Sequence, residues 1–183
     1  MLFYKGEVIH ILISVLTISA AFSFPFMISF PVVFITLGLG FVLHELAHKI
    51  VAMRYGCVAV YRAWLEGLAL ALIFAIFTGG NFVFAAPGAV YIYKHAITRR
   101  EDGIISLAGP LTNLMLAVMF LYLAPLLGKI AIIGFQVNAF LAFFNLLPIP
   151  PLDGSKVFSW NIGVWLFAIG FAAIMAFSYP LVF

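Results

Sequence analysis

Residues 26–53 of the chain read FMISFPVVFITLGLGFVLHELAHKIVAM, an apolar run whose second half carries His44, Glu45 and His48. A helix that crosses a bilayer needs roughly 20 apolar residues, and this run is long enough. Ionisable side chains at membrane depth cost free energy, and those that persist there usually serve a function. The run therefore predicts a transmembrane helix with a functional site inside it.

The composition extends this interpretation to the whole chain. Of its 183 residues, 66% are hydrophobic and only 8% are charged, with a mean hydropathy of +1.24. A soluble domain carries about 25% charged residues, so most of this exterior must face lipid and a soluble protein is excluded. The net charge of +3 reflects orientation in a membrane rather than binding to nucleic acid. The single cysteine, Cys57, excludes an intrachain disulfide framework and a cysteine-cluster metal site.

Apolar runs long enough to cross a membrane follow one another without polar linkers between separate domains. The sequence predicts an all-α polytopic membrane protein of one domain, residues 1–183, with about five to six transmembrane helices. The expected crossings are Val8–Phe24, Phe26–Met53, Ile104–Ala124, Ile130–Leu147 and Gly163–Phe183.

The segment between the second and third of these crossings does not fit a further pair of spanning helices. Trp64–Thr78 is apolar, but about 15 residues is short for a crossing. A Gly-Gly-Asn stretch and a Pro-Gly pair follow it and break helices. On either side, Val58–Arg62 and Ala89–Tyr93 have the residue types of short strands. We expect a small membrane-associated β-hairpin or re-entrant sheet here.

The lysine and arginine residues give an independent indication of orientation. With a cytosolic N-terminus and residues 57–100 on the same side, eight of the nine basic residues fall at the cytosolic face, and Lys129 falls at the other. Cytosolic loops of membrane proteins carry such an excess of Lys and Arg. The chain is therefore predicted to be an integral, multi-pass membrane protein whose N-terminus and site opening face the cytosol.

The segment from His44 to His48 is an H-E-x-x-H motif. On a helix, residues four apart share a face, so both imidazoles can reach one metal ion. Glu45, one position along, would lie beside the metal and could take a proton from water there. The simpler alternative is a pair of packed imidazoles with Glu45 paired to Lys49 or Arg54.

A catalytic zinc site usually has three protein ligands, so a third must come from elsewhere in the chain. Asp153 stands out by its context, between the proline-rich run Asn145–Leu152 and Gly154, which permits a turn. The simpler alternative makes Asp153 the N-cap of a helix that starts at Ser155. That alternative explains the Asp-Gly pair but not why an apolar helix ends in a rigid polar break.

With both pieces in view, the chain resembles the site-2 protease family of intramembrane zinc metalloproteases. The H-E-x-x-H motif matches the family's zinc motif, and residues 145–154, NLLPIPPLDG, match its second signature, N-x-x-P-x-P-x-L-D-G, at every fixed position. Ala108-Gly109-Pro110 with Asn113 also looks like the start of the family's intervening core helix. The resemblance covers roughly residues 31–160, the expected catalytic core.

The resemblance implies a role for particular residues of the two motifs. His44, His48 and Asp153 would bind one Zn2+ per chain. Glu45 would activate water. Asn145 would hold the substrate or stabilise the oxyanion, and its simpler role is capping or packing at the end of its helix.

The implied activity is that of a metalloendopeptidase, which hydrolyses peptide bonds within the transmembrane segments of membrane-protein substrates. Residues 79–88 would belong to a membrane-embedded sheet whose edge binds the unwound substrate, although residues 62–93 could be purely structural. A transmembrane peptide and the lipid bilayer are the expected partners, with no nucleic acid, and the first and last helices would part to admit substrate. The alternatives are a transmembrane metal-ion transporter and a non-catalytic relative that only binds membrane segments.

Overall fold

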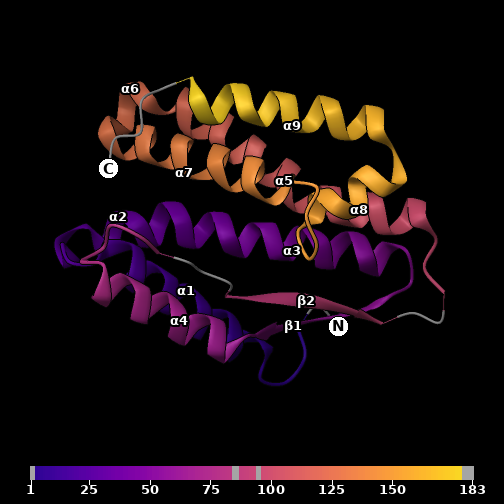
Figure 1. Cartoon of the computed structure of the whole chain (residues 1–183), viewed down its shortest axis with the longest axis horizontal. Coiled ribbons are helices and arrows are strands. Elements are labelled where there is room, and N and C mark those ends of the chain that lie inside the picture. Colours follow the sequence, from indigo (N-terminus) through magenta and orange to yellow (C-terminus); the bar gives the residue numbers. More distant parts are fainter. Residues whose placement is uncertain (1–2, 84–86, 94–95, 179–183) are drawn as a thin grey trace.

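The computed structural model describes residues 3–83, 87–93 and 96–178, and it is mostly helical with a two-stranded antiparallel sheet (Figure 1). This agrees with the helical class and the small sheet expected from the sequence. Most of the long helices lie close to the long axis of the molecule (Figure 1). The helices are α1 (Glu7–Ser23), α2 (Phe30–Val33), α3 (Leu39–Arg54), α4 (Leu65–Phe77), α5 (Arg99–Tyr122), α6 (Ala124–Leu127), α7 (Lys129–Asn145), α8 (Asp153–Trp160) and α9 (Ile162–Phe177), and the strands are β1 (Val58–Ala63) and β2 (Gly88–Tyr93).

Two helices in the described part of the chain are long and apolar enough to cross a membrane. The first runs without a break from Met27 to Arg54, 28 residues of which an 18-residue stretch has a mean hydropathy of 2.0, and α3 forms its second half. The second is α5, which has 24 residues and contains an 18-residue stretch of the same mean hydropathy. The shorter apolar helices α1, α4, α7 and α9 have 10–17 residues each, so the five to six crossings expected from the sequence stay a prediction.

The predicted strands form, but the segment that joins them is not a hairpin turn. β1 and β2 pair in antiparallel fashion, with Val58 opposite Tyr93 and Ala63 opposite Gly88. The helix α4 lies between them in sequence, because residues 65–77 are rich in the good helix formers Leu and Ala and contain no proline. The hairpin expected from the sequence is therefore wrong in its connection and right in its pairing.

The end of α4 also corrects the expectation for residues 79–88. Gly79 and Gly80 have φ angles of 63° and 83°, which glycine adopts at no steric cost, and they turn the chain instead of extending it as a strand. Residues 79–83 therefore lie outside the sheet, and of the expected segment Gly88 belongs to β2. Residues 84–86 lie outside the described part of the chain.

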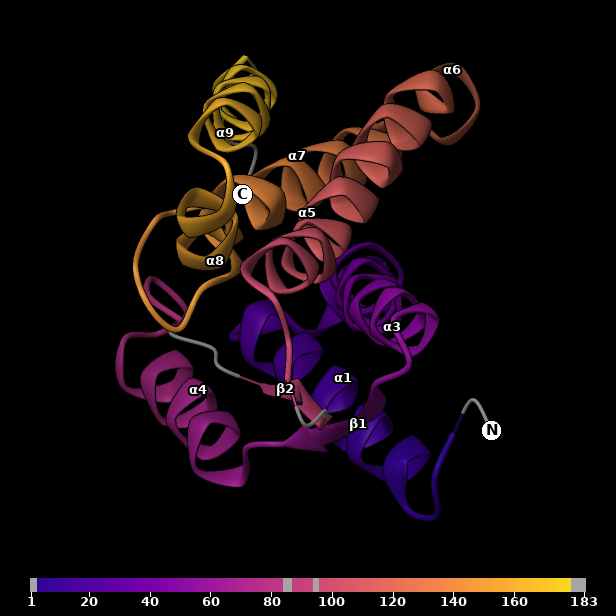
Figure 2. The same cartoon turned by 90° about the vertical axis from the view of Figure 1, so that its right-hand side faces the viewer.

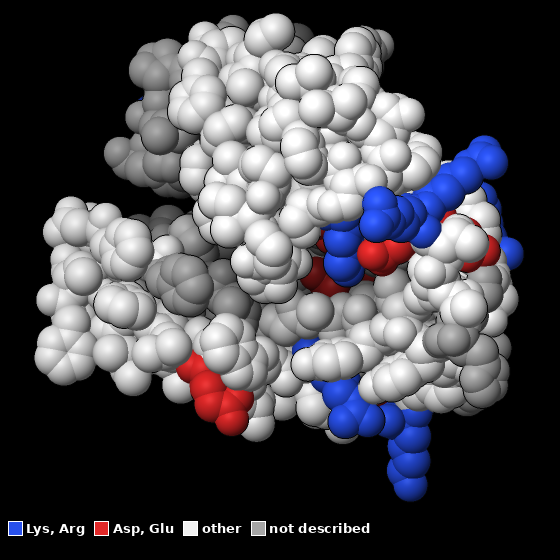
Figure 3. All heavy atoms as spheres, turned by 45° about the vertical axis from the view of Figure 1, so that its right-hand side comes forward, with Lys and Arg blue, Asp and Glu red and all other residues white. Residues whose placement is uncertain are grey.

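Many exposed side chains are apolar and several buried ones are polar, the reverse of a soluble protein. Phe77 is 85% exposed and Ile28 is 93% exposed, whereas Lys49, Asn113 and Asn138 are at most 1% exposed. On the face drawn in Figure 3, the Lys and Arg side chains gather toward the right-hand end, and most of the remaining surface carries no charge. An exterior of this kind is suited to contact with lipid.

The helix α5 packs against both α3 and α7 (Figures 1 and 2). Small residues let the helices approach closely. Ala117 of α5 and Ala139 and Ala142 of α7 are fully buried. At Gly134 of α7, an added Cβ would lie 2.6 Å from the ring of Phe120. These three helices form the tightly packed frame in which the candidate site lies.

Candidate metal centre

Three of the predicted site residues meet between α3 and the start of α8. The Nε2 atoms of His44 and His48, both on α3, lie 3.0 Å apart. Oδ2 of Asp153 lies 3.3 Å from the first and 3.2 Å from the second. Both histidines are buried, and the Asp153 side chain is only 16% exposed. The structure thus brings the three expected ligands together, and these atoms could hold one metal ion.

The loop between α7 and α8 delivers Asp153 to this position. α7 ends at Asn145, because the prolines that follow cannot continue a helix, and the loop then reaches toward α3 (Figure 1). Gly154 packs directly on the end of α7, where an added Cβ would overlap the carbonyl of Leu146. Nε1 of Trp165 in α9 donates to the same carbonyl at 2.8 Å. These contacts anchor the loop, and Asp153 with it.

Asp153 does not act as a helix cap. It is the first residue of α8, whose N-cap is Leu152, and no side-chain hydrogen bond caps this helix. The N-cap alternative is therefore wrong, and the carboxylate is free to face the imidazoles. Burial raises the pKa of the Asp153 carboxyl, but His48 and His44 in their protonated forms more than offset this and hold that pKa well below its usual range. A positive charge beside Asp153 thus favours the carboxylate, which is the form that binds a metal.

The donor set fits a zinc ion. Zinc in proteins is mostly tetrahedral, with bonds of about 2.0–2.2 Å to histidine nitrogen and carboxylate oxygen, which places its ligand atoms about 3.3–3.5 Å apart. The three separations here, 3.0, 3.2 and 3.3 Å, are close to those of one face of such a tetrahedron. Two histidines with one carboxylate are also a donor set of catalytic zinc sites, which keep the fourth position open.

The helix α5 leaves room for an ion beside the histidines because it carries no side chain there. An added Cβ on Gly109 would lie 2.6 Å from Nε2 of His44 and would overlap Nε2 of His48. Both are the atoms that would bind the ion, so glycine alone fits at this position. The sequence placed Gly109 in a core helix and not in the site. The signal that could have located it is a Gly-Pro pair shortly before Asn113 in an apolar helix.

Residues of α5 bind the Nδ1 atoms of both imidazoles, the nitrogens that are not candidate metal ligands. Nδ1 of His44 lies 2.6 Å from Oδ1 of Asn113, and Nδ1 of His48 lies 2.7 Å from the carbonyl oxygen of Ile105. Both oxygens only accept, so each Nδ1 donates and each Nε2 keeps its lone pair. Partners of this kind fix the tautomer and the orientation of metal-binding histidines. The lone pairs of both Nε2 atoms are thus available at the centre of the site.

Glu45 lies on α3 beside the two histidines and is partly buried. Its carboxylate lies next to the backbone N–H of Val90 in β2. The alternative in which Glu45 pairs with Lys49 is wrong, because Lys49 binds Glu7 of α1, and both of those side chains are buried. Within the described residues, no ion pair joins Glu45 to Arg54. Glu45 is therefore free to act beside the candidate metal site.

Asn145 is the last residue of α7. Its Nδ2 donates to the carbonyl of Leu141 at 2.9 Å, which is a packing role at the helix end. An amide nitrogen carries two hydrogens, so a second hydrogen remains for another acceptor. The role of Asn145 in holding a substrate or an oxyanion stays a prediction.

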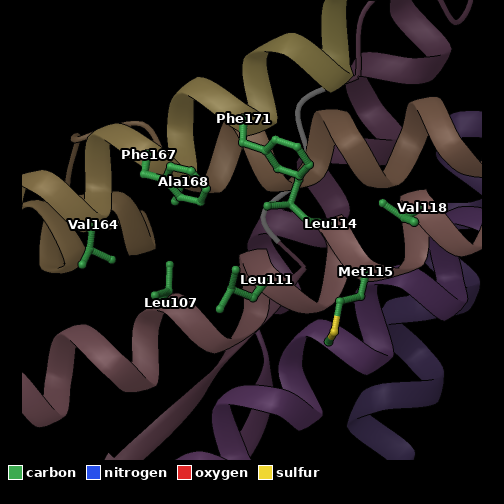
Figure 4. A pocket seen from close by; sticks show the side chains of 9 residues that line it. All are labelled: Leu107, Leu111, Leu114, Met115, Val118, Val164, Phe167, Ala168 and Phe171. Atoms are coloured by element: carbon green, nitrogen blue, oxygen red, sulfur yellow. The ribbon is translucent and has the colours of Figure 1, made fainter.

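A separate apolar groove lies between α5 and α9, with a volume of about 410 Å³ (Figure 4). The side chains that line it are all apolar, and the close-up shows that they come from facing sides of the two helices. The groove therefore offers shape and apolar contact but no group that could take part in acid–base or metal chemistry. Its lining residues are Leu107, Leu111, Leu114, Met115, Val118, Val164, Phe167, Ala168 and Phe171.

Curated proteins of several organisms resemble the chain. A protein of Methanocaldococcus jannaschii named "Putative zinc metalloprotease MJ0611" is 46% identical over 187 residues, which cover 96% of this chain and 97% of the relative. YwhC of Bacillus subtilis, which has the same designation, is 31% identical over 150 residues, 69% of this chain and 67% of the relative. Rip2 of Mycolicibacterium smegmatis, also so designated, is 40% identical over 132 residues, 61% of this chain and 50% of the relative.

No protein-family profile and no solved structure matches the chain. The Methanocaldococcus relative, however, aligns over almost the full length of both proteins at 46% identity. The names of the relatives agree with the two histidines and one carboxylate that meet beside Gly109. The chain therefore belongs to the zinc metalloprotease family that these relatives represent.

Proposed function

We propose that this metalloprotease acts inside the membrane, as a site-2 protease that hydrolyses peptide bonds within the transmembrane segments of its substrates. The observation that carries the proposal is the place of the His44, His48 and Asp153 group, which lies among helices whose outer surfaces are apolar. A protease for soluble substrates would need to open such a site onto a polar surface. One zinc ion would bind per chain, and the distribution of Lys and Arg supports a cytosolic N-terminus and site opening.

When bound, zinc would act as a Lewis acid that polarises the scissile carbonyl and lowers the pKa of water at the site. His44 and His48 keep their Nε2 atoms turned toward the site because Asn113 and Ile105 bind their Nδ1 atoms. Glu45 would take a proton from the attacking water and pass it to the leaving amine. One carboxylate would thus serve first as the base and then as the acid.

The sheet offers one covered edge and one edge that faces α3. The edge of β1 is covered by α1, because the N–H of Tyr61 donates to Oε1 of Glu7 at 2.8 Å. The N–H of Ala63 likewise lies 3.3 Å from Nδ1 of His10. These outward N–H groups of β1 are already bound, so a further strand could not use them.

The edge of β2 is the one that we assign to substrate binding. Val90 pairs with Tyr61, and because the Tyr61 N–H points away from the partner strand, the Val90 N–H does so as well. That N–H lies next to the carboxylate of Glu45. An unwound substrate that pairs with β2 would take the place of Glu45 at this N–H, and it would thereby bring its backbone past the general base.

One hydrogen of the Asn145 amide binds the carbonyl of Leu141. With its second amide hydrogen, Asn145 would hold the substrate or stabilise the oxyanion. A transmembrane segment would enter between α1 and α9, the first and last apolar helices of the described chain, of which α1 packs on α4 and β1 and α9 on α7 and α8. The substrate must also unwind there, because a helical peptide bond is shielded by its own turn.

The test compares purified wild type with Glu45→Gln in detergent. Glu66→Gln is the matched control, because Glu66 is an exposed glutamate in the first turn of α4. We expect all three proteins to bind zinc equally. Wild type and the control should cleave a single-span model substrate, whereas Glu45→Gln should lose at least about 100-fold in rate. A chelator should abolish cleavage by wild type, and zinc should restore it.

Two results would contradict the proposal in different ways. Zinc bound by wild type, with no cleavage of any helix-breaking single-span substrate, would favour metal-ion transport or simple binding of membrane segments. A folded wild type that binds no metal would mean that the histidines are structural, and the zinc site itself would be refuted.

A further inference from the structure

Two buried asparagines continue the hydrogen-bond chain that begins at His44. Nδ2 of Asn113 in α5 lies 3.0 Å from Oδ1 of Asn138 in α7 and 3.1 Å from the carbonyl oxygen of Gly40 in α3. Nδ2 of Asn138 in turn donates to the carbonyl of Gly134 at 2.9 Å. Neither asparagine is exposed to solvent. This series of hydrogen bonds therefore runs from the candidate metal site through α5 into α7.

The orientation of both side-chain amides in this series is fixed, because backbone carbonyls only accept hydrogen bonds. The carbonyl of Gly134 requires Asn138 to turn its NH2 group that way, so the Asn138 oxygen faces Asn113. Asn113 must then present its NH2 group to Asn138 and to Gly40, so the Asn113 oxygen faces His44. An oxygen at that position accepts the proton of Nδ1, and His44 keeps the lone pair of Nε2 for a metal.

A reversed Asn113 amide would disable this histidine as a ligand. Its NH2 group would then face Nδ1 of His44, which would have to accept, and the imidazole proton would move to Nε2. A protonated Nε2 has no lone pair for zinc. Oδ1 of Asn138 and the carbonyl oxygen of Gly40 both oppose this reversal, because the oxygen of a reversed Asn113 amide would lie against these two acceptors.

Asn138 also contacts the irregular part of the helix that carries the histidines. Residues Phe34–Gly38 form a π-helical turn immediately before α3. The Thr36 carbonyl in that turn lies 3.4 Å from Nδ2 of Asn138. Gly40 lets the amide approach, because an added Cβ there would lie 3.1 Å from Cγ of Asn138. A π-turn often marks a functional site, and here one amide links it to the histidine network.

We propose that Asn138 is a positioning residue for the metal centre, which acts through Asn113 to hold His44 in the tautomer that binds zinc. This inference rests on the proposed zinc site and adds to it a residue that lies outside both sequence motifs. Asn138 contacts none of the three expected ligands directly, and it lies 25 residues from Asn113 in sequence. Its effect on His44 is therefore indirect, and the Asn113 amide is the route that the hydrogen bonds provide.

The test measures zinc affinity by competition with a chromophoric chelator, and the visible absorption of the Co2+-loaded protein, for wild type, Asn138→Ala and Asn138→Leu. Loss of a residue that binds a metal-ligating histidine costs about 10–100-fold in metal affinity. Asn138 acts through one intermediary, so we expect a loss of roughly tenfold, at the lower end of that range, and an altered Co2+ spectrum. The two substitutions differ in volume, and thermal unfolding of the metal-free proteins reports whether each one folds.

Thr112→Val is the matched control. Thr112 precedes Asn113 on α5, and its hydroxyl donates to the Ala108 carbonyl within the same helix at 2.9 Å. The substitution removes a hydrogen bond next to the network without touching it, so zinc affinity and the Co2+ spectrum should stay those of wild type.

A second pair of variants, in which Asn113 is replaced by Asp, distinguishes a positioning role of Asn138 from a packing role. In Asn113→Asp, a carboxylate presents an oxygen to His44 whichever way it is turned, so it needs no orientation by Asn138, and its second oxygen lies against the Asn138 oxygen. Adding Asn138→Ala to Asn113→Asp should therefore not lower the zinc affinity, against a loss of roughly tenfold in the wild-type background. Equal losses in both backgrounds would overturn the inference and leave Asn138 as a packing residue.

The inference and the proposed function fail in different ways. Wild type that binds no zinc would refute the proposed function. Wild type that binds zinc, with folded Asn138 variants of unchanged affinity and spectrum, would overturn the inference alone. Nitrogen NMR of the metal-free wild type keeps the inference open to refutation even if the variants do not fold. His44 should carry its proton on Nδ1, and a proton on Nε2 would overturn the inference.

Discussion

The sharpest consequence of the site geometry concerns Gly109. In Gly109→Ala, the new Cβ would lie 2.6 Å from Nε2 of His44, and ordinary contact begins at 3.4 Å, so the imidazole must retreat by about 0.8 Å. A metal site tolerates errors of about 0.2 Å in its ligand distances. We therefore expect zinc affinity to fall by more than the roughly 100-fold that the loss of an outer histidine partner can cost.

The fold should survive this substitution. Alanine stabilises a helix interior by about 1 kcal/mol relative to glycine, and the following Pro110 opposes that gain by crowding a Cβ before it. Gly170→Ala in α9 is the matched control, because nothing lies within 4 Å of a Cβ added there. The assay combines chelator competition for zinc with thermal unfolding of the metal-free protein. A folded Gly109→Ala protein with the zinc affinity of wild type would refute the geometry described for the site.

Three further predictions test other parts of the molecule. Lys49→Met leaves the buried Glu7 without its partner and should lower the free energy of unfolding by about 3–5 kcal/mol. The double variant Lys49→Met with Glu7→Gln should show a smaller decrease in the free energy of unfolding, and denaturant titration in detergent measures both. Wild type held at a zinc concentration of 100 times the dissociation constant should be more stable than the chelated protein by about 2.7 kcal/mol, and a melting temperature that does not respond to chelator would contradict a folded-state metal site. In a Cys57→Ser background, Lys5→Cys and Lys129→Cys should react with a membrane-impermeant maleimide from opposite sides of the membrane; labelling from one side would contradict the expected topology.

The two histidines were predictable from sequence because their geometry is local. Residues four apart on a helix share a face, so His44 and His48 had to converge once the apolar run formed a helix. The prolines after Asn145 likewise predict the end of α7. No local rule brings Asp153 to α3, however, and its place among the expected ligands came from the resemblance to a known family.

The helix α4 and the contact between Asn113 and Asn138 were not predictable in the same way. A membrane crossing needs a minimum length, but a helix packed on α1 does not, and α4 forms with 13 residues. Asn113 and Asn138 meet because of the rotation of α5 and α7 about their axes, which depends on small residues such as Gly134 along the whole contact. No local pattern records that rotation.

The shortness of α4 has a consequence for the lipid around it. A helix of 13 residues is about 20 Å long, roughly 10 Å less than the hydrocarbon thickness of an ordinary bilayer. In the membrane placement that we propose, acyl chains that contact α4 would compress, or head groups and water would follow one end of the helix inward. Either response would bring the polar boundary of the membrane closer to the sheet. The thickness of the host bilayer would then become part of the environment of the strand beside Glu45.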